Sequence, residues 1–249
     1  MSAAATSTGV YLYGIVRADE LPAVSAEGVA GSPVELIECD GLAAIVSRLP
    51  GGDLRVKRRD LNRHLQVLEE AFVETTILPC SFGTVLASEE DVETTLLGDR
   101  AGELREMLTR LDGTVQLNVK AVYDEEHLLR ELVTTNAEIA RLREASSRLG
   151  DAGHYERLLL GELVATLVDQ RRQADAERIL SQLLDVSEEF ATDEVGDYVA
   201  LKVSFLVSKK RLDRFDARLE ETARMEHPLI GLEVIGPLPP SAFVSALGR

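Results

Sequence analysis

Two segments that contain proline and glycine constrain this chain most, because each fixes a point where regular structure must stop. One runs from Leu78 to Thr84 and the other from Gly236 to Pro240. Proline lacks an N–H and holds φ near −65°, so the first segment stops a helix and the second cannot extend an interior strand ladder. Both lie beside apolar residues, which favours a fixed packing surface over a reaction centre. We expect the second segment to be extended and to pack Leu238 and Phe243 onto the protein body.

The first part of the chain shows three strand patterns. Residues Tyr11–Arg17 alternate and are rich in β-forming residues, and Val34–Ile37 and Leu42–Ser47 follow as two further strands. Because Asp40-Gly41 between the last two is a tight-turn signal, we expect these strands to form a hairpin.

Helical patterns follow this predicted hairpin. A helix opening at Asp60 or Asn62 should bury a stripe made of Leu61, Leu65, Leu68 and Phe72. Phe82–Leu86 can form a fourth strand, and Ser88 followed by three acidic residues is typical of a helix N-terminus. The next helix should bury Leu104, Met107, Leu108 and Leu111.

A second block of elements starts after the turn signal Asp112-Gly113. Its patterns are a half-buried strand over 115–121, helical periodicity over 128–149, a long helix over 155–184, a strand over 198–207, a helix over 211–225 and a strand over 230–234. This order suits a ferredoxin-like α+β sandwich, or an altered version of one. The sequence therefore predicts an α+β protein of two domains. Residues 1–112 form an N-terminal mixed α+β domain, and residues 113–249 a C-terminal modified ferredoxin-like domain with inserted helices and a proline-rich tail.

Charge and composition narrow the possible partners and the location. The formal net charge is −16, so we expect no nucleic acid partner and no binding to anionic lipid. No run of 18 or more apolar residues exists to span a membrane, and the first nine residues do not resemble a secretory signal. Cys39 and Cys80 lie far apart, which favours free thiols in a reducing cytoplasm over a disulfide.

Residue patterns that carry chemistry are missing from this sequence. The four histidines are scattered, and no H-x-x-x-H or C-x-x-C spacing joins them to other ligands. No glycine-rich phosphate loop and no G-x-S-x-G elbow occurs, and no base is placed near Ser81, which follows Cys80. We therefore predict that the protein is not an enzyme and uses no metal, nucleotide or flavin cofactor.

A local basic cluster stands out in this acidic chain. It comprises Arg55, Lys57, Arg58, Arg59 and Arg63. The cluster can be a solvated linker, or it can anchor an acidic surface of a protein partner. Arginine and aromatic residues dominate binding hot spots, so the candidate partner-binding residues are Tyr11, Tyr13, Arg55, Arg58, Arg59, Arg63 and Phe82. The alternative for the three aromatic residues is a place in the core.

An ordered set of motifs is similar to the gas vesicle protein F/L family. Tyr11–Val16 resembles the opening strand of that family, and Leu42–Ser47 resembles its next strand. His64–Leu68, Leu78-Pro79 and Phe82–Thr84 resemble its helix-to-strand block, and Gly236–Pro240 with Phe243 its closing proline-rich segment. This chain departs from the family where Leu238 replaces a common aromatic residue and Ser241-Ala242 replaces Tyr-Ser.

The resemblance implies an accessory or minor structural protein for gas vesicle assembly. It implies an N-terminal domain that contacts the small hydrophobic shell protein, a modified ferredoxin-like C-terminal domain, and no catalysed reaction. The expected partners are the shell protein and other gas vesicle accessory proteins, and the expected location is the cytoplasm, in association with the gas vesicle. The alternative is a small-ligand binder or an enzyme that uses the ferredoxin-like sheet as a floor, which would require an enclosed pocket with perturbed titratable groups.

Overall fold

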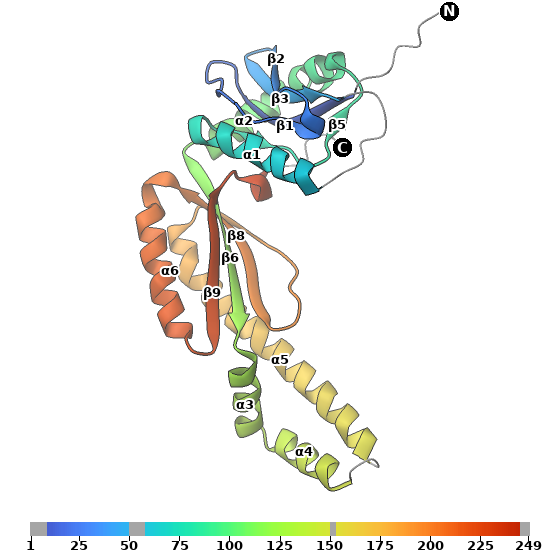
Figure 1. The fold of residues 1–249 in the computed structure, drawn as a ribbon. Helices are drawn as coiled ribbons and strands as arrows, with labels where there is room; N and C mark the ends of the chain where they lie inside the picture. Colours follow the sequence, from blue (N-terminus) through green and yellow to red (C-terminus); the bar gives the residue numbers. More distant parts are fainter. Residues whose placement is uncertain (1–8, 50–57, 150–152, 245–249) are drawn as a thin grey trace, which may run out of the picture. The chain divides into compact units, whose positions relative to one another are not determined.

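The computed structural model of this protein describes residues 9–49, 58–149 and 153–244 of the 249-residue chain. The elements of these residues build two separate sheets, each accompanied by helices (Figure 1). This mixture of antiparallel strands and helices confirms the predicted α+β class.

The chain divides into two compact units. The first unit comprises residues 1–116 and 237–249, and the second comprises residues 117–236. The closing segment thus belongs with the first unit, whereas the sequence analysis placed it with the C-terminal block. The predicted domain bounds, 1–112 and 113–249, stay a prediction.

Strand β1 (Val10–Arg17) is the centre of the first unit and pairs with neighbours on both edges. The sheet order is β2-β3-β1-β4, and β5 also pairs with β1. The neighbours are β2 (Glu35–Cys39), β3 (Leu42–Arg48), β4 (Leu78–Pro79) and β5 (Val85–Leu86). The predicted hairpin is confirmed, since β2 and β3 pair antiparallel and are joined by Asp40 and Gly41. Their φ values of 49° and 73° are the left-handed values that a tight hairpin turn requires.

Gly14 lies where β1 changes register and another strand comes close. The pairing of β1 with β3 shifts between Leu12 and Gly14, which marks a bulge. Pro79 pairs with Gly14 on the other edge, and a Cβ at position 14 would lie 2.8 Å from the Leu78 carbonyl oxygen. Because only glycine allows this approach, the opening strand and the first proline-containing segment form one packed junction.

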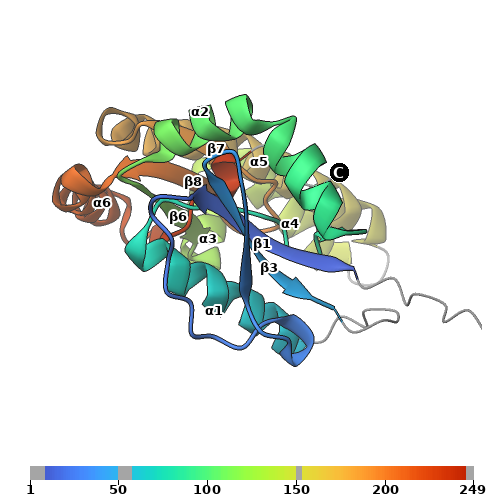
Figure 2. The same cartoon turned by 90° about the horizontal axis from the view of Figure 1, so that it is seen from above.

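Helices cover both faces of this first sheet. They are η1 (Val29–Gly31), α1 (Arg58–Glu74), the π-helical segment η2 (Asp91–Gly98) and α2 (Ala101–Leu111). Figure 2 shows α1 on one side of β1 and β3 and α2 on the other. The four apolar residues predicted for α2 are all buried. The predicted cap is also confirmed, because Ser88 Oγ accepts a hydrogen bond from the Asp91 N–H at 3.1 Å.

The second unit has the ferredoxin-like order of elements. The elements are β6 (Thr114–Tyr123), α3 (Glu125–Thr135), α4 (Ala137–Leu149), α5 (His154–Leu183), η4 (Leu184–Val186), β7 (Glu189–Thr192), β8 (Val199–Ser208), η5 (Lys209–Arg211), α6 (Leu212–Glu226) and β9 (Ile230–Leu238). Without α3 and α4 the order is strand, helix, strand, strand, helix, strand, with sheet order β7-β8-β6-β9. The modified ferredoxin-like prediction is confirmed, and β7, which the sequence analysis missed, completes the fold.

The helical periodicity over 128–149 belongs to two helices. Asn136 separates α3 from α4, and its Oδ1 accepts hydrogen bonds from the backbone N–H groups of Glu138 at 3.0 Å and Ile139 at 3.2 Å. Such a cap starts a new helix, so the chain turns there without a proline or glycine.

Helix α5 is the longest element, with 30 residues, and its bounds agree closely with the predicted long helix. Among the described residues, neither α5 nor any other helix is long and apolar enough to cross a membrane.

The closing segment packs on the first unit, as expected. A short turn, η6 (Ser241–Phe243), follows the prolines, and Leu238 and Phe243 are both half-buried. Arg110 of α2 donates a hydrogen bond to the Phe243 carbonyl oxygen at 2.6 Å. The Ala242 N–H donates to Gln116 Oε1 at 2.8 Å. These hydrogen bonds explain why the segment belongs with the first unit.

Candidate partner-binding surface

The predicted basic cluster lies around the start of α1. Arg55 and Lys57 fall outside the described residues. Arg58 and Arg59 are exposed, whereas Arg63 is half-buried and pairs with two acidic side chains of the same unit. Arg58 and Arg59 are therefore accessible to a partner, and Arg63 is held by contacts within the fold.

The buried face of α1 agrees only in part with the predicted apolar stripe. That stripe comprises Leu61, Leu65, Leu68 and Phe72. Leu68 is buried as predicted and Phe72 is half-buried against the core, but the other buried residues are Asp60, His64, Val67 and Ala71. Leu61 and Leu65 are 38% and 46% exposed, so the helix is turned by about one residue from the predicted orientation.

Hydrogen bonds inside the first unit explain this orientation of α1. Asp60 Oδ1 accepts a hydrogen bond from the Ala30 N–H at 3.3 Å. His64 Nδ1 is hydrogen-bonded to the Tyr11 hydroxyl at 3.0 Å. Burying a polar group costs little free energy as long as its hydrogen bonds are kept. Exposing a leucine costs only the free energy that its burial would have gained. The polar partners therefore decide which side of the helix faces the core.

The rotation leaves an apolar and basic surface on α1, which we call the α1 ridge. It comprises Arg58, Leu61 and Leu65, whose spacings of three and four place them on one face of the helix. Arg59 flanks this ridge. Arginine is enriched in protein-binding surfaces. The sequence analysis had assigned the two leucines to the core.

Tyr11 and Tyr13 are core residues, which corrects their candidacy for partner binding. Both are fully buried, and Phe82 is half-buried against the same cluster. The Tyr11 and Tyr13 ring centroids lie 5.0 Å apart, and the His64 ring stacks on Tyr13 at 5.6 Å. The Tyr11 hydroxyl also accepts a hydrogen bond from the Gly83 N–H at 3.0 Å. In this conformation the two tyrosines fix α1 from beneath and present no surface to a partner.

The Tyr13 hydroxyl belongs to a buried chain of hydrogen bonds. It accepts from the Val29 N–H at 2.7 Å and lies 2.9 Å from Ser47 Oγ. Ser47 Oγ donates to the Pro33 carbonyl at 2.8 Å, so the Tyr13 hydroxyl is the donor to Ser47. Burial raises the pKa of Tyr13, because the phenolate would lose its hydration there. The chain of bonds ties the loop before β2 to the sheet.

Lowering the pH should destabilise the first unit through His64. Burial lowers the pKa of this imidazole to about 4, although a hydrogen bond with the Cys80 backbone opposes the shift. Between the unfolded value of about 6.5 and this folded value, the unfolded chain binds the additional proton, so stability falls as the pH falls through this window. From pH 7 to pH 5 the loss should be about 2 kcal/mol, measured by urea denaturation at both pH values.

The matched variants for this pH experiment are His64→Gln and His154→Gln. His64→Gln should remove most of the loss between pH 7 and pH 5, because no titrating group remains at the buried position. His154 is exposed at the start of α5, so its replacement should leave the loss intact. An unchanged pH dependence in His64→Gln would contradict the assignment.

The described residues bring no metal-binding set together. No group of three or more histidine, cysteine, aspartate or glutamate side chains that could hold a metal ion occurs in them. Burial raises the pKa of the Cys80 thiol, which disfavours the reactive thiolate.

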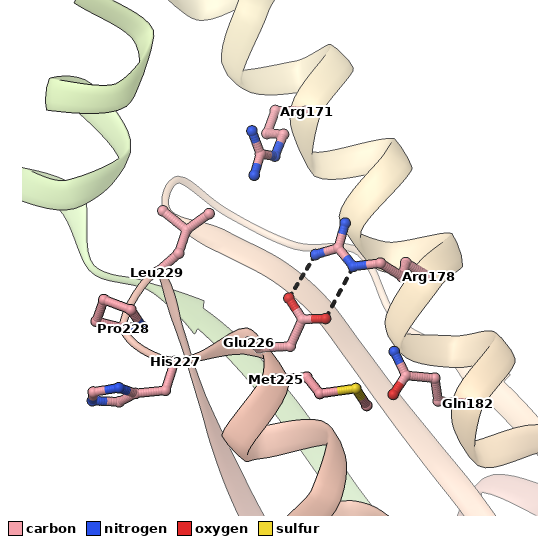
Figure 3. A pocket seen from close by; sticks show the side chains of 8 residues that line it. All are labelled: Arg171, Arg178, Gln182, Met225, Glu226, His227, Pro228 and Leu229. Carbon is pink, nitrogen blue, oxygen red and sulfur yellow. Dashed lines mark hydrogen bonds and ion pairs between the residues drawn. The ribbon is translucent and has the colours of Figure 1, made fainter. Parts of the chain in front are cut away.

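One pocket in the second unit could be taken for a ligand site. It has a volume of about 420 Å³ and is shown in Figure 3. It is lined by Arg171, Arg178, Gln182, Met225, Glu226, His227, Pro228 and Leu229. Its polar wall comes from α5 and from the end of α6.

The charged groups of this pocket bind one another. Arg178 donates two hydrogen bonds to Glu226, at 3.0 and 2.5 Å, visible in Figure 3. Arg178 and Arg171 both donate to the fully buried Asp175, at 2.6 and 2.9 Å, and Arg171 also reaches Glu131 of α3 at 2.8 Å. Two arginines facing three carboxylates form a clamp that holds α3, α5 and α6 together. We call it the Asp175 clamp.

Sequence reasoning missed the Asp175 clamp. Its signal is the spacing Arg171, Asp175 and Arg178, which places the three side chains on one face of the long helix. The spacing alone does not distinguish it from the many solvated ion pairs of this chain. The buried partner, the hydroxyl of Tyr123 at 2.8 Å, comes from a strand 52 positions away.

Comparison with known proteins matches the whole described chain to one family. The family model described as gas vesicle synthesis protein GvpL/GvpF matches residues 9–245. The chain is 37% identical to gas vesicle protein F of Streptomyces sp. (strain CB03234) over 238 residues, which cover 94% of this chain and 98% of that relative. It is 25% identical to gas vesicle protein F of Nostoc sp. (strain PCC 7120 / SAG 25.82 / UTEX 2576), with coverage of 89% and 94%.

Two solved structures share the fold. The crystal structure of the gas vesicle protein GvpF from Anabaena sp. PCC7120 superposes with a TM-score of 0.80 at 24% identity, covering 96% of this chain and 99% of that chain. GvpF from Microcystis aeruginosa gives a TM-score of 0.75 at 22% identity, with the same coverage. The likeness extends over both units.

Proposed function

Since the chain belongs to the GvpL/GvpF family of gas vesicle synthesis proteins, which implies a role in gas vesicle formation, we propose that it is an accessory or minor structural protein that binds the small hydrophobic shell protein. It would work in the cytoplasm, in association with the vesicle and its other accessory proteins. The family is one of gas vesicle proteins and not a known enzyme family, and we assign the chain no reaction.

The α1 ridge is the observation that supports this proposal. Its two leucines are exposed although the helix could have buried them, and Arg58 lies on the same face. A hydrophobic partner gains by covering such leucines, and an arginine beside them can bind an acidic group at the rim. The hydrogen bond between Tyr11 and His64 holds the helix from below, so little order has to be gained on binding.

Two ridge substitutions test the proposal in the full-length chain. Leu61→Asp with Leu65→Asp should weaken capture of purified shell protein at least tenfold, because the partner would have to bury two carboxylates. Both leucines are exposed, so the variant should keep the melting temperature of the parent within a few degrees. Binding is measured by pull-down and by biolayer interferometry.

The control carries the same charge change elsewhere on the first unit. Leu21→Asp with Leu36→Asp alters two leucines of nearly equal exposure, 41% and 37%, that belong neither to the ridge nor to α1. This variant should bind shell protein as the parent does. Equal binding by the ridge variant and the parent would exclude α1 as the contact.

The pocket in the second unit does not favour the alternative of a small-ligand binder. Its arginines are engaged by Asp175, Glu226 and Glu131 within the protein. A ligand would have to replace these ion pairs, at a cost of several kcal/mol. The exposed ridge of the first unit therefore remains the better-supported functional surface.

A further inference from the structure

Helix α4 and the first half of α5 form a hairpin that buries very few of its own side chains. The two helices pack side by side, beyond the sheet of the second unit (Figure 1). In α4 only Ile139 is buried. In α5, all of whose residues are described, burial begins at Asp175, so the preceding 21 residues contain no buried side chain.

The composition of this half of α5 does not fit its exposure. Residues 158–168 read Leu-Leu-Leu-Gly-Glu-Leu-Val-Ala-Thr-Leu-Val. The large apolar side chains of 159–168 share one side of the helix and are only half-buried there. An apolar helix face of this length is normally fully covered by its neighbours. Helix α4 can cover one side only. On the other side Leu158 and Tyr155 are 53% and 64% exposed, and a Cβ added at Gly161 would meet no atom within 4 Å.

The charge of the hairpin selects among possible occupants of this face. Residues 137–172 carry six acidic and six basic side chains, so the segment is neutral in a chain of net charge −16. Several of these charges pair within their own helix, as Arg141 does with Glu138 and Arg148 with Glu144. A strongly charged partner would gain nothing here. Most of the surface of this acidic chain repels a second copy, because both carry negative charge. The neutral hairpin does not.

We propose that the hairpin of α4 and the first half of α5 is an interface between two copies of this chain. Two such hairpins brought together by a two-fold axis form a four-helix bundle, in which each α5 gains the apolar neighbours it lacks. At a rise of 1.5 Å per residue, the first half of α5 presents a face roughly 25 Å long. An interface of this length is small for a specific one. The dimer should therefore depend on concentration in the micromolar range.

Sedimentation equilibrium of the full-length chain tests the proposal between about 1 and 100 μM. The apparent mass should rise with concentration from the monomer value of 27.2 kDa towards twice that value. Tyr155→Glu with Leu158→Glu should shift the dissociation constant at least tenfold upwards. Leu149→Glu on α4, a half-exposed position, should act in the same direction. Circular dichroism confirms that the helices remain.

The control is Ile235→Glu, at a position on β9 as exposed as Tyr155, at 64%. It should leave the dissociation constant unchanged. A parent chain that stays monomeric at 100 μM overturns the proposal. So does a dimer that survives the α5 substitutions, or one that only Ile235→Glu dissociates. Shell-protein binding is measured separately. A parent chain that dimerises but does not bind shell protein would count against the α1 ridge and not against this interface.

Discussion

Replacing Asp175 with alanine should lower the free energy of unfolding by about 2–4 kcal/mol, through loss of the Asp175 clamp. The carboxylate is fully buried and accepts hydrogen bonds from Tyr123, Arg171 and Arg178. Without it the buried Tyr123 hydroxyl loses its acceptor. The effect stays below that of a fully enclosed pair because both arginine side chains are partly exposed and can turn to water.

The measurement is thermal and urea denaturation, with Asp169→Ala as the control. Asp169 lies six positions earlier on α5, is exposed, and pairs with Arg172 on the helix surface. Its loss should cost less than about 1 kcal/mol, as is usual for a surface ion pair. The melting temperature of Asp175→Ala should fall by roughly 5–15 °C. A fall no larger than that of the control would show that the clamp contributes no more than a surface pair.

Adding one methyl group at Gly28 should destabilise the first unit by about 2–3 kcal/mol. The added Cβ of Gly28→Ala would lie 2.3 Å from Ser47 Oγ and 2.5 Å from the Tyr13 hydroxyl. It would also lie 2.7 Å from the backbone oxygen of Ser32, which accepts a hydrogen bond from the Gly28 N–H. The loop must therefore move away, and the bonds of Tyr13 to Val29 and Ser47 break or lengthen.

Gly102→Ala serves as the matched control in the same unit. Gly102 lies in α2, and a Cβ there would meet no atom within 4 Å. Alanine favours a helix over glycine, so this variant should be neutral or more stable by up to about 1 kcal/mol. Urea denaturation compares the two. Equal stability of Gly28→Ala and the parent would mean that the buried chain of hydrogen bonds contributes little.

The order and type of most elements could be predicted because their signals are local. The hairpin at Asp40-Gly41 follows from the left-handed backbone that such a turn needs. The cap at Ser88 follows from a hydroxyl three residues before an N–H that needs an acceptor. The length of α5 follows from an uninterrupted helical sequence. In each case the deciding atoms are neighbours along the chain.

Strand β7 escaped prediction because it depends on its neighbour. Its residues Glu189–Thr192 are few and mostly exposed, and no alternation stands out in them. They become a strand because Phe190 and Ala191 pair with Phe205 and Ser204 of β8. A short edge strand is stabilised by the ladder it joins, which no pattern of its own reveals.

The sequence by itself determined the α+β class, the ferredoxin-like order of the second block and the resemblance to a family. The tertiary structure alone decided which side of α1 is buried. The apolar stripe favoured Leu61 and Leu65, but the partners of His64 and Asp60 lie 53 and 30 positions away in the chain. Hydrogen bonds between such distant groups form only in the folded protein, where an unsatisfied polar group costs more than an exposed leucine. For that reason the α1 ridge, the candidate contact surface, could not be predicted from periodicity.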